Sequence, residues 1–180
     1  MIKAGVLLAV GLVFGAMKMT KKSISKKGID LLIQREGVEL MVYRDSANLR
    51  TIGVGHLLTG RELESGYVDI GGKKVPWRQE ITEYQAEVLL KQDLKRFENA
   101  VNEYVNVALT QHQFDSLVSF VFNIGVNAFK NSTLLRLLNQ GDYESVPGQL
   151  ERWNRAGGQV VTGLIHRRNS EIDQFRGVLA

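Results

Sequence analysis

The segment EGVELMVYRDSANLRTIGVGHLLTG (residues 36–60) decides the fold that we predict for the front of the chain. Upstream of it, residues 23–39 carry apolar side chains at helical spacing, and Gly37 is a typical helix stop directly after Glu36. Residues 43–56 lose this spacing, contain turn-forming residues and continue in the alternating stretch TIGVG. We therefore predict a helix that ends near this segment, followed by a small β-hairpin.

Downstream of this segment the sequence alternates between turns and helices. Residues 60–78 contain the turn sequence DIGGKKVP, which predicts a second short hairpin. Thr82 and Gln85 have capping-box spacing and begin the longest apolar stripe, which predicts one helix of about twenty residues. Further helices are predicted over four ranges, the last two separated by a Gly-Gly pair: 110–125, 132–141, 144–155 and 163–175.

These elements predict an α+β protein. We expect a small β-hairpin lobe and a larger helical lobe that are joined by the long helix. An active-site cleft is expected between the lobes, because a hairpin region of this size cannot bury itself alone. The length of 180 residues suits one such domain with an appendage.

The composition excludes several classes of protein. The chain is 44% hydrophobic and 23% charged and has no Cys, which excludes a disordered chain, a disulfide scaffold, a Cys-based metal site and thiol chemistry. The net charge of +4 by itself suggests a nucleic-acid binder. However, residues 1–27 hold six Lys and no acid, whereas residues 28–180 hold 17 Lys and Arg against 19 Asp and Glu. Since no aromatic residues lie among the lysines of 18–27, we expect no nucleic-acid partner.

The N-terminal segment 1–23 differs from the predicted catalytic domain 24–180. The run AGVLLAVGLVFGAM (4–17) has no polar side chain, is rich in Gly and Ala, and is followed by lysines. As a helix it would be about 21 Å long, which is short of the roughly 30 Å hydrocarbon core of a membrane. A cleavable signal peptide, a buried core helix and a weak membrane anchor all fit this pattern. The excess of Lys on its C-terminal side argues against simple export.

Three polar residues are expected on one wall of the cleft: Glu36 at a helix end, Asp45 in the entry turn and Thr51 on the returning strand. Hydrolysis of a glycosidic bond needs one carboxyl that keeps its proton and a second that stays ionised. Glu36 has apolar neighbours and is the better candidate for the first, and Asp45 in its polar turn for the second. Thr51 could hold a water near Asp45. By spacing alone, however, two such acids are more often a solvated helix residue and a turn residue.

The wider sequence resembles the endolysin muramidases of bacteriophages and prophages, the phage lysozymes of glycoside hydrolase family 24. In that family a Glu is followed by eight residues, an Asp, five residues and a Thr, and Glu36, Asp45 and TIGVGH (51–56) match this pattern without a departure. Four later segments, together with Glu171, resemble the helical lobe of the family: LTQHQFDSLVSFVFNIG (109–125), NSTLLRLLNQGDY (131–143), ERWNRAGG (151–158) and GLIHRR (163–168).

The resemblance implies a lysozyme-like fold and a peptidoglycan hydrolase that causes lysis of the host cell. Such an enzyme cleaves the β-1,4 bond between N-acetylmuramic acid and N-acetylglucosamine. The resemblance further implies that Glu36 is the general acid, Asp45 the second carboxylate and Thr51 the residue that positions the attacking water. Members of this type are usually inverting, which needs carboxyls roughly 6.5–9.5 Å apart. We expect no cofactor and no metal.

Additional residues are candidates for supporting roles. His56 lies inside the motif, and we interpret it as structural because the chemistry already has its two carboxyls. Arg167 or Arg168 is expected near the acid and could bind wall carboxylates, because residues 123–180 carry 7 Lys and Arg against 5 acids. Asn123 either caps its helix or lines the groove.

Two alternatives to a muramidase stay open. A lytic transglycosylase uses a single acid and releases an anhydro product, and a wall-binding module would lack catalysis. The intact set of Glu36, Asp45 and Thr51 argues against the second alternative.

The location of the enzyme depends on the N-terminal run. Residues 4–17 resemble the anchor of signal-arrest-release endolysins, which predicts transient association with the host inner membrane and action in the periplasm. Otherwise the enzyme would stay in the host cytoplasm until release. The absence of Cys excludes activation by thiol exchange. We expect a monomer.

Overall fold

The computed structural model describes residues 20–45 and 47–179. The hydrophobic run at residues 4–17 therefore lies outside the described residues. Within the described ranges, no helix is both long and apolar enough to span a membrane.

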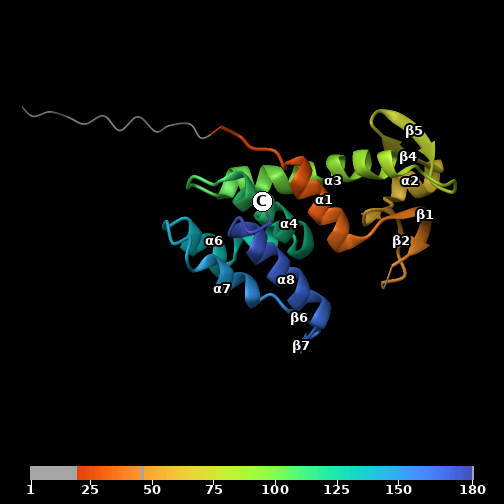
Figure 1. The fold of residues 1–180 in the computed structure, drawn as a ribbon. Helices are drawn as coiled ribbons and strands as arrows, with labels where there is room; N and C mark the ends of the chain where they lie inside the picture. The colour runs from red at the N-terminus through yellow and green to blue at the C-terminus, as the bar shows by residue number, and fades with distance from the viewer. Residues whose placement is uncertain (1–19, 46, 180) are drawn as a thin grey trace, which may run out of the picture.

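The front of the chain forms one helix and a three-stranded antiparallel sheet of order β1-β2-β3 (Figure 1). The elements are α1 (Lys26–Glu36), β1 (Glu39–Arg44), β2 (Arg50–Gly53) and β3 (His56–Leu57). The predicted hairpin is confirmed, with Tyr43 paired to Thr51. The helix predicted over 23–39 is too long at its end, because Gly37 has a φ of 78° that turns the chain into β1.

The remainder of the β lobe consists of a short helix and the second predicted hairpin. Its elements are α2 (Gly60–Ser65), β4 (Tyr67–Ile70) and β5 (Lys73–Pro76), and the two strands pair antiparallel. The sequence prediction missed α2, although Thr59 and Glu62 form a complete capping box at its start. A six-residue helix without a buried residue has no apolar stripe by which it could be recognised.

The long helix α3 (Glu83–Tyr104) begins at the predicted capping box of Thr82 and Gln85 and belongs to both lobes. Its first part contributes Ala86 and Leu89 to the core of the β lobe, which also holds buried side chains of the hairpins. From Leu90 onward its apolar face belongs to the larger core of the helical lobe. Helix α3 therefore joins the lobes by being packed into each of them (Figure 1).

The helical lobe contains α1 together with the second half of the chain. The later elements are α4 (Gln111–Ile124), α5 (Val126–Lys130), α6 (Thr133–Leu138), α7 (Val146–Glu151), β6 (Arg155–Ala156), β7 (Gln159–Val160) and α8 (Thr162–Phe175). The prediction for 144–155 is corrected: α7 is shorter, and the Gly-Gly pair forms the turn of a β6–β7 hairpin. Gly157 and Gly158 both have positive φ, 56° and 81°, as a tight two-residue hairpin turn requires.

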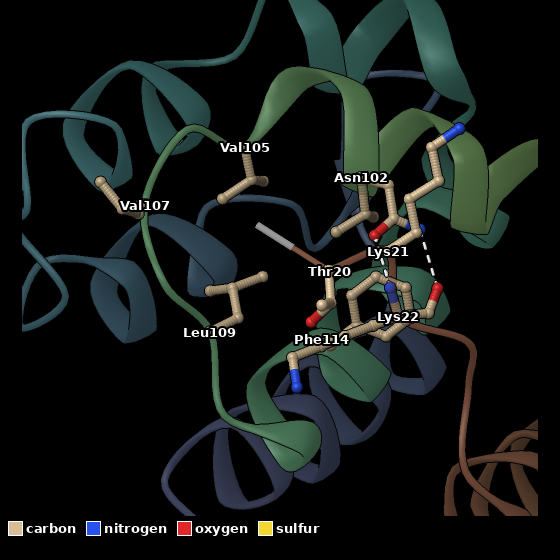
Figure 2. A pocket seen from close by; sticks show the side chains of 9 residues that line it. Thr20, Lys21, Lys22, Asn102, Val105, Val107, Leu109 and Phe114 are labelled. Atoms are coloured by element: carbon tan, nitrogen blue, oxygen red, sulfur yellow. Dashed lines mark hydrogen bonds between the residues drawn. The ribbon is translucent and has the colours of Figure 1, made fainter. Parts of the chain in front are cut away.

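The chain enters this lobe along helix α3. The backbone N–H of Lys22 donates to Oδ1 of Asn102 at 2.9 Å, and Nδ2 of Asn102 donates back to the carbonyl of Lys22 at 2.8 Å (Figure 2). These two residues, Thr20 and Lys21 line one side of a small pocket. Its other lining residues are apolar: Val101, Val105, Val107, Leu109 and Phe114. The polypeptide is thus fixed to the helical lobe from Thr20 onward.

Candidate active site

Glu36 is the last residue of α1, at the border between the two lobes. Its side chain is 21% exposed, and Oε1 lies 2.6 Å from Nη1 of Arg167 on α8. A short ion pair between partly buried groups restricts the carboxyl to a narrow range of positions. The structure therefore places Arg167 beside the predicted acid, and a role of Arg167 in substrate binding stays a prediction.

Asp45 and Thr51 lie at the same end of the β1–β2 hairpin. Thr51 pairs with Tyr43, and Asp45 directly follows the last residue of β1, at the start of the connecting turn. Oδ1 of Asp45 accepts hydrogen bonds from the backbone N–H groups of Ala47 at 2.9 Å and Leu49 at 2.8 Å. Thr51 is only 3% exposed, and its hydroxyl donates to the carbonyl of Leu49 at 3.3 Å. The turn itself therefore orients both side chains.

Tyr43 connects the hairpin electrostatically with the end of α1. Partial burial raises the pKa of its phenol, and the negative charges of Asp45, Glu39 and Glu36 raise this pKa further. Charges act on a titrating group in this way only when they lie close to it. Two of the three carboxylates that act on this phenol, Glu36 and Asp45, are the predicted catalytic residues. Sequence reasoning did not single out Tyr43.

A buried polar network centred on Glu171 lies behind this ion pair. Glu171 is 0% exposed, and its Oε1 accepts hydrogen bonds from Oγ of Ser119 at 2.8 Å and Nε of Arg167 at 3.1 Å. The same guanidinium reaches Glu36 through Nη1. Glu171 therefore positions the arginine that positions Glu36.

Arg168 points into the interior and not into the cleft. It is 1% exposed, it packs over the ring of Phe120, and its Nε lies 3.0 Å from Oε2 of Glu171. Burial lowers the pKa of Arg168 to about 10, against the opposing negative charge of Glu171. The expectation that Arg168 binds substrate directly is corrected, because a side chain buried to this degree cannot touch a polymeric ligand.

Asn123 is exposed near the end of α4, where its side chain contacts a buried arginine and also lines a groove. Its Oδ1 accepts a hydrogen bond from Nη2 of Arg168 at 2.9 Å. Asn123 also lines an open groove of about 470 Å³ with residues from the neighbouring helices: Arg96, Phe97, Phe122, Ile124, Gly125, Val126, Asn127 and Ala128. Contact of Asn123 with substrate in this groove stays a prediction.

His56, on β3, connects this strand with α2 of the β lobe and with α3. Its Nδ1 lies 2.8 Å from Oδ2 of Asp93 on α3, and its Nε2 lies 3.3 Å from Oε1 of Glu62 on α2. Burial lowers the pKa of His56, but the hydrogen bond and charge of Asp93 and the charge of Glu62 outweigh it, so the net pKa is raised. These contacts support the structural interpretation. Across the described residues no cluster of His, Asp and Glu side chains is suited to hold a metal ion.

We expect the Asp93→Asn variant to be destabilised more at about pH 5.5 than at about pH 9. A group whose pKa is raised on folding contributes stability that is fully present below its unfolded pKa and is lost as the pH rises through the folded value. Since the pKa of His56 is raised, its bond to Asp93 stabilises the fold most in acid. Thermal unfolding of both proteins at the two pH values measures the difference. An equal loss of Tm at both would contradict this.

The supporting network contains residues that the sequence did not reveal. Arg35 donates to Oγ of Ser119 at 3.1 Å and to Oγ of Ser170 at 2.9 Å. These three residues lie on α1, α4 and α8, and no local pattern connects them. A detectable signal exists for Glu171 with Arg167 and Arg168, whose spacings of four and three residues on one predicted helix favour ion pairs.

A glutamate at the end of a helix, an aspartate in the hairpin turn that follows, and a small β lobe joined to a helical lobe by one long helix are typical of the lysozyme-like class of protein. This class is also the one that comparison with known sequences finds. The model of the phage lysozyme family matches residues 33–171, and the chain belongs to this family.

Relatives of the chain carry endolysin names. It is 41% identical over 145 residues to the endolysin of Salmonella phage P22, covering 81% of this chain and 92% of that protein. It is 36% identical over 167 residues to the SAR-endolysin of Escherichia phage Mu, and the alignment covers 93% of this chain and 84% of that protein. The endolysin of Bacillus phage B103 is 37% identical over 85% of this chain. The chain spans about half the length of two Bacillus phage endolysins that it matches: 54% of the protein from phage B103 and 42% of the protein from phage PZA.

Solved structures confirm the predicted α+β, lysozyme-like fold. A crystal structure of a P22 lysozyme mutant superimposes with a TM-score of 0.74 at 38% identity, covering 86% of this chain and 99% of that one. The muramidase domain of SpmX from Asticaccaulis excentricus gives a TM-score of 0.71 at 33% identity, covering 85% and 97%.

Proposed function

We propose that this protein is an endolysin that hydrolyses the β-1,4 bond between N-acetylmuramic acid and N-acetylglucosamine in peptidoglycan. The observation that carries the proposal is the position of the two acids at the border of the lobes: Glu36 ends α1 of the helical lobe, and Asp45 directly follows β1 of the β lobe. Two carboxyls in different surroundings are what acid–base cleavage of a glycosidic bond needs. Membership of the phage lysozyme family and the endolysin names of full-length relatives add support.

In this mechanism Glu36 is the general acid. Arg167 contacts its Oε1, and among the described residues no side chain or backbone group donates to Oε2. Once Glu36 carries a proton, Oε2 can donate it to the leaving glycosidic oxygen. Arg167 and Glu171 hold the carboxyl in place during this transfer.

Asp45 is the ionised partner in the same mechanism. Its carboxylate is held in place by hydrogen bonds from two backbone N–H groups of its own turn. It faces the sugar from the β lobe and activates the water that attacks the anomeric carbon. Thr51, on the paired strand, helps to position that water.

The masses of the products separate this proposal from its alternatives. Digestion of purified cell walls should release fragments in which each cleavage has added one water. A lytic transglycosylase would release anhydro fragments that are lighter by one water, and a wall-binding module would release none. Mass spectrometry of the soluble fragments therefore tests the reaction type directly.

We also propose that residues 4–17 tether the protein transiently to the host inner membrane before it acts in the periplasm as a monomer. The run has no polar side chain, is only weakly hydrophobic because it is rich in Gly and Ala, and is flanked by Lys. The SAR-endolysin name of the phage Mu relative, which aligns with 93% of this chain, supports the proposal. Fractionation of cells that express the intact protein is expected to find it first with membranes. Purely soluble behaviour at all stages would instead favour retention in the host cytoplasm until release.

A further inference from the structure

A second polar cavity adjoins the Glu36–Arg167 ion pair. It has a volume of about 290 Å³ and lies between the last turn of α1 and the first half of α8. It is lined by Gln34, Arg35, Gly163, His166, Arg167 and Ser170, and we call it the Arg35 pocket. Three of the six lining residues are basic and none is acidic, so the walls are suited to a negatively charged ligand.

Arg35 is the residue of this pocket whose charge is least compensated. Its guanidinium donates to Oγ of Ser119 and to Oγ and the carbonyl of Ser170, all of which are neutral acceptors. Within the described part of the chain, no carboxylate oxygen lies within 4.0 Å of its nitrogens. A largely buried guanidinium without a counter-ion is costly, and this cost falls when an anion binds.

The surrounding charges do not cancel either. Among the described residues, Arg167 and Arg168 form ion pairs with two carboxylates, those of Glu36 and Glu171. Arg35 adds a third guanidinium to this cluster and is connected to Glu171 through Oγ of Ser119. Burial lowers the pKa of Arg35, and although Glu171 opposes this effect, the positive charge of Arg167 adds to it. The cluster therefore has one positive charge in excess, next to a cavity that is open to solvent.

We propose that the Arg35 pocket binds an oxyanion, the group shared by carboxylates and phosphate. The planar guanidinium groups of Arg35 and Arg167 present N–H donors that match such oxygens, and His166 on the exposed rim adds a further donor. A volume of 290 Å³ exceeds that of several water molecules at about 30 Å³ each, so it accommodates the anionic group together with part of the molecule that carries it.

The first residues of α8 favour the same ligand. The helix begins at Thr162, and its N-cap residue Val161 makes no side-chain capping hydrogen bond. The positive end of the helix dipole thus lies beside Gly163, which lines the pocket. Since Arg167 lines the pocket and also holds Glu36, a bound anion would share this arginine with the predicted general acid.

Two sources could supply the anion. One is a carboxylate of the wall peptide, and this source rests on the proposed function. The other is free phosphate, which does not depend on it. Acetate and inorganic phosphate serve as probes of the two, and neither measurement uses wall cleavage, so failure here is distinguishable from failure of the proposed function.

The experiment is thermal unfolding of the intact protein in sodium phosphate and in sodium acetate, each compared with sodium chloride at equal ionic strength. At a concentration about tenfold above the dissociation constant, we expect Tm to rise by about 4 °C over chloride in at least one of them. A rise in phosphate alone identifies phosphate as the ligand, and a rise in acetate identifies a carboxylate. No rise in either salt overturns the proposal.

Variants of rim residues show whether the anion that raises Tm binds in the Arg35 pocket. Gln34→Glu places a carboxylate on the rim of the pocket, where it should raise Tm in chloride and remove the additional rise caused by the anion. His166→Gln, a second exposed rim position, should reduce the rise. Arg176→Gln removes one exposed positive charge at the other end of α8 and should leave the rise unchanged. An undiminished rise in both Gln34→Glu and His166→Gln would show that the anion binds elsewhere and overturn the proposal.

Discussion

Replacement of Glu36 by Gln is expected to reduce the rate at which the protein clears purified cell walls by about 10³-fold. Gln has the same shape and can still accept a hydrogen bond from Arg167, but it has no proton to donate to the leaving oxygen. The rate is measured as the fall in turbidity of a wall suspension at equal protein concentration.

The control for this experiment must show that the fold is intact. Glu36 is partly exposed and its partner Arg167 keeps Glu171, so the Tm of the Glu36→Gln variant should stay within a few degrees of the wild type, about 2–4 °C. Glu103→Gln changes an exposed acid near the end of α3 and should clear walls at the wild-type rate. Normal clearing by Glu36→Gln would remove this residue from the mechanism.

Replacement of Glu171 by Gln is expected to destabilise the protein by about 3–5 kcal/mol. Its carboxylate is fully buried and is the ion-pair partner of both Arg167 and Arg168. Without it the positive charge of Arg168 stays buried with neutral amide oxygens as its close acceptors, that of Asn123 and that of the introduced glutamine. Urea unfolding at neutral pH measures the change in the free energy of unfolding.

A compensating variant distinguishes charge from packing in this experiment. If the cost arises from an unpaired buried charge, Arg168→Met combined with Glu171→Gln should recover part of the stability, because the uncompensated cation is removed. Glu103→Gln again provides the surface control, with an expected effect below about 0.5 kcal/mol. A loss of less than about 1 kcal/mol in Glu171→Gln would mean that water or structural relaxation compensates the arginines.

Much of the fold could be predicted because its longer elements carry periodic apolar patterns. The stripe that begins at Ala86 predicted α3, and all six of its residues are buried: Ala86, Leu89, Leu90, Leu94, Phe97 and Val101. The β6–β7 hairpin could not be recognised in this way. Its strands have two residues each, which is too short for alternation, and its Gly-Gly turn is equally typical of a break between helices.

The predicted catalytic residues could be recognised in the sequence, whereas the residues that hydrogen-bond around them could not. Glu36, Asp45 and Thr51 lie within one short segment, so their spacing is visible in the sequence. The contacts of Arg35 with Ser119 and Ser170 arise only when α1, α4 and α8 pack together. Sequence reasoning expected an arginine near the acid but could not decide between Arg167 and Arg168, because neighbouring helical positions point about 100° apart and only packing fixes which one faces Glu36.

The division of the site between two cores has a consequence for its tolerance of remote mutations. Glu36 belongs to a helix packed into the helical core, whereas the strand that carries Thr51 packs into the core of the β lobe. The span between the two carboxyls therefore depends on the angle at which α3 holds the lobes, together with the short link between α1 and β1. A kink near Leu89 and Leu90, where the two cores meet along α3, would change this span without touching either acid. In this sense the geometry of the predicted catalytic pair depends partly on the straightness of a helix to which neither acid belongs.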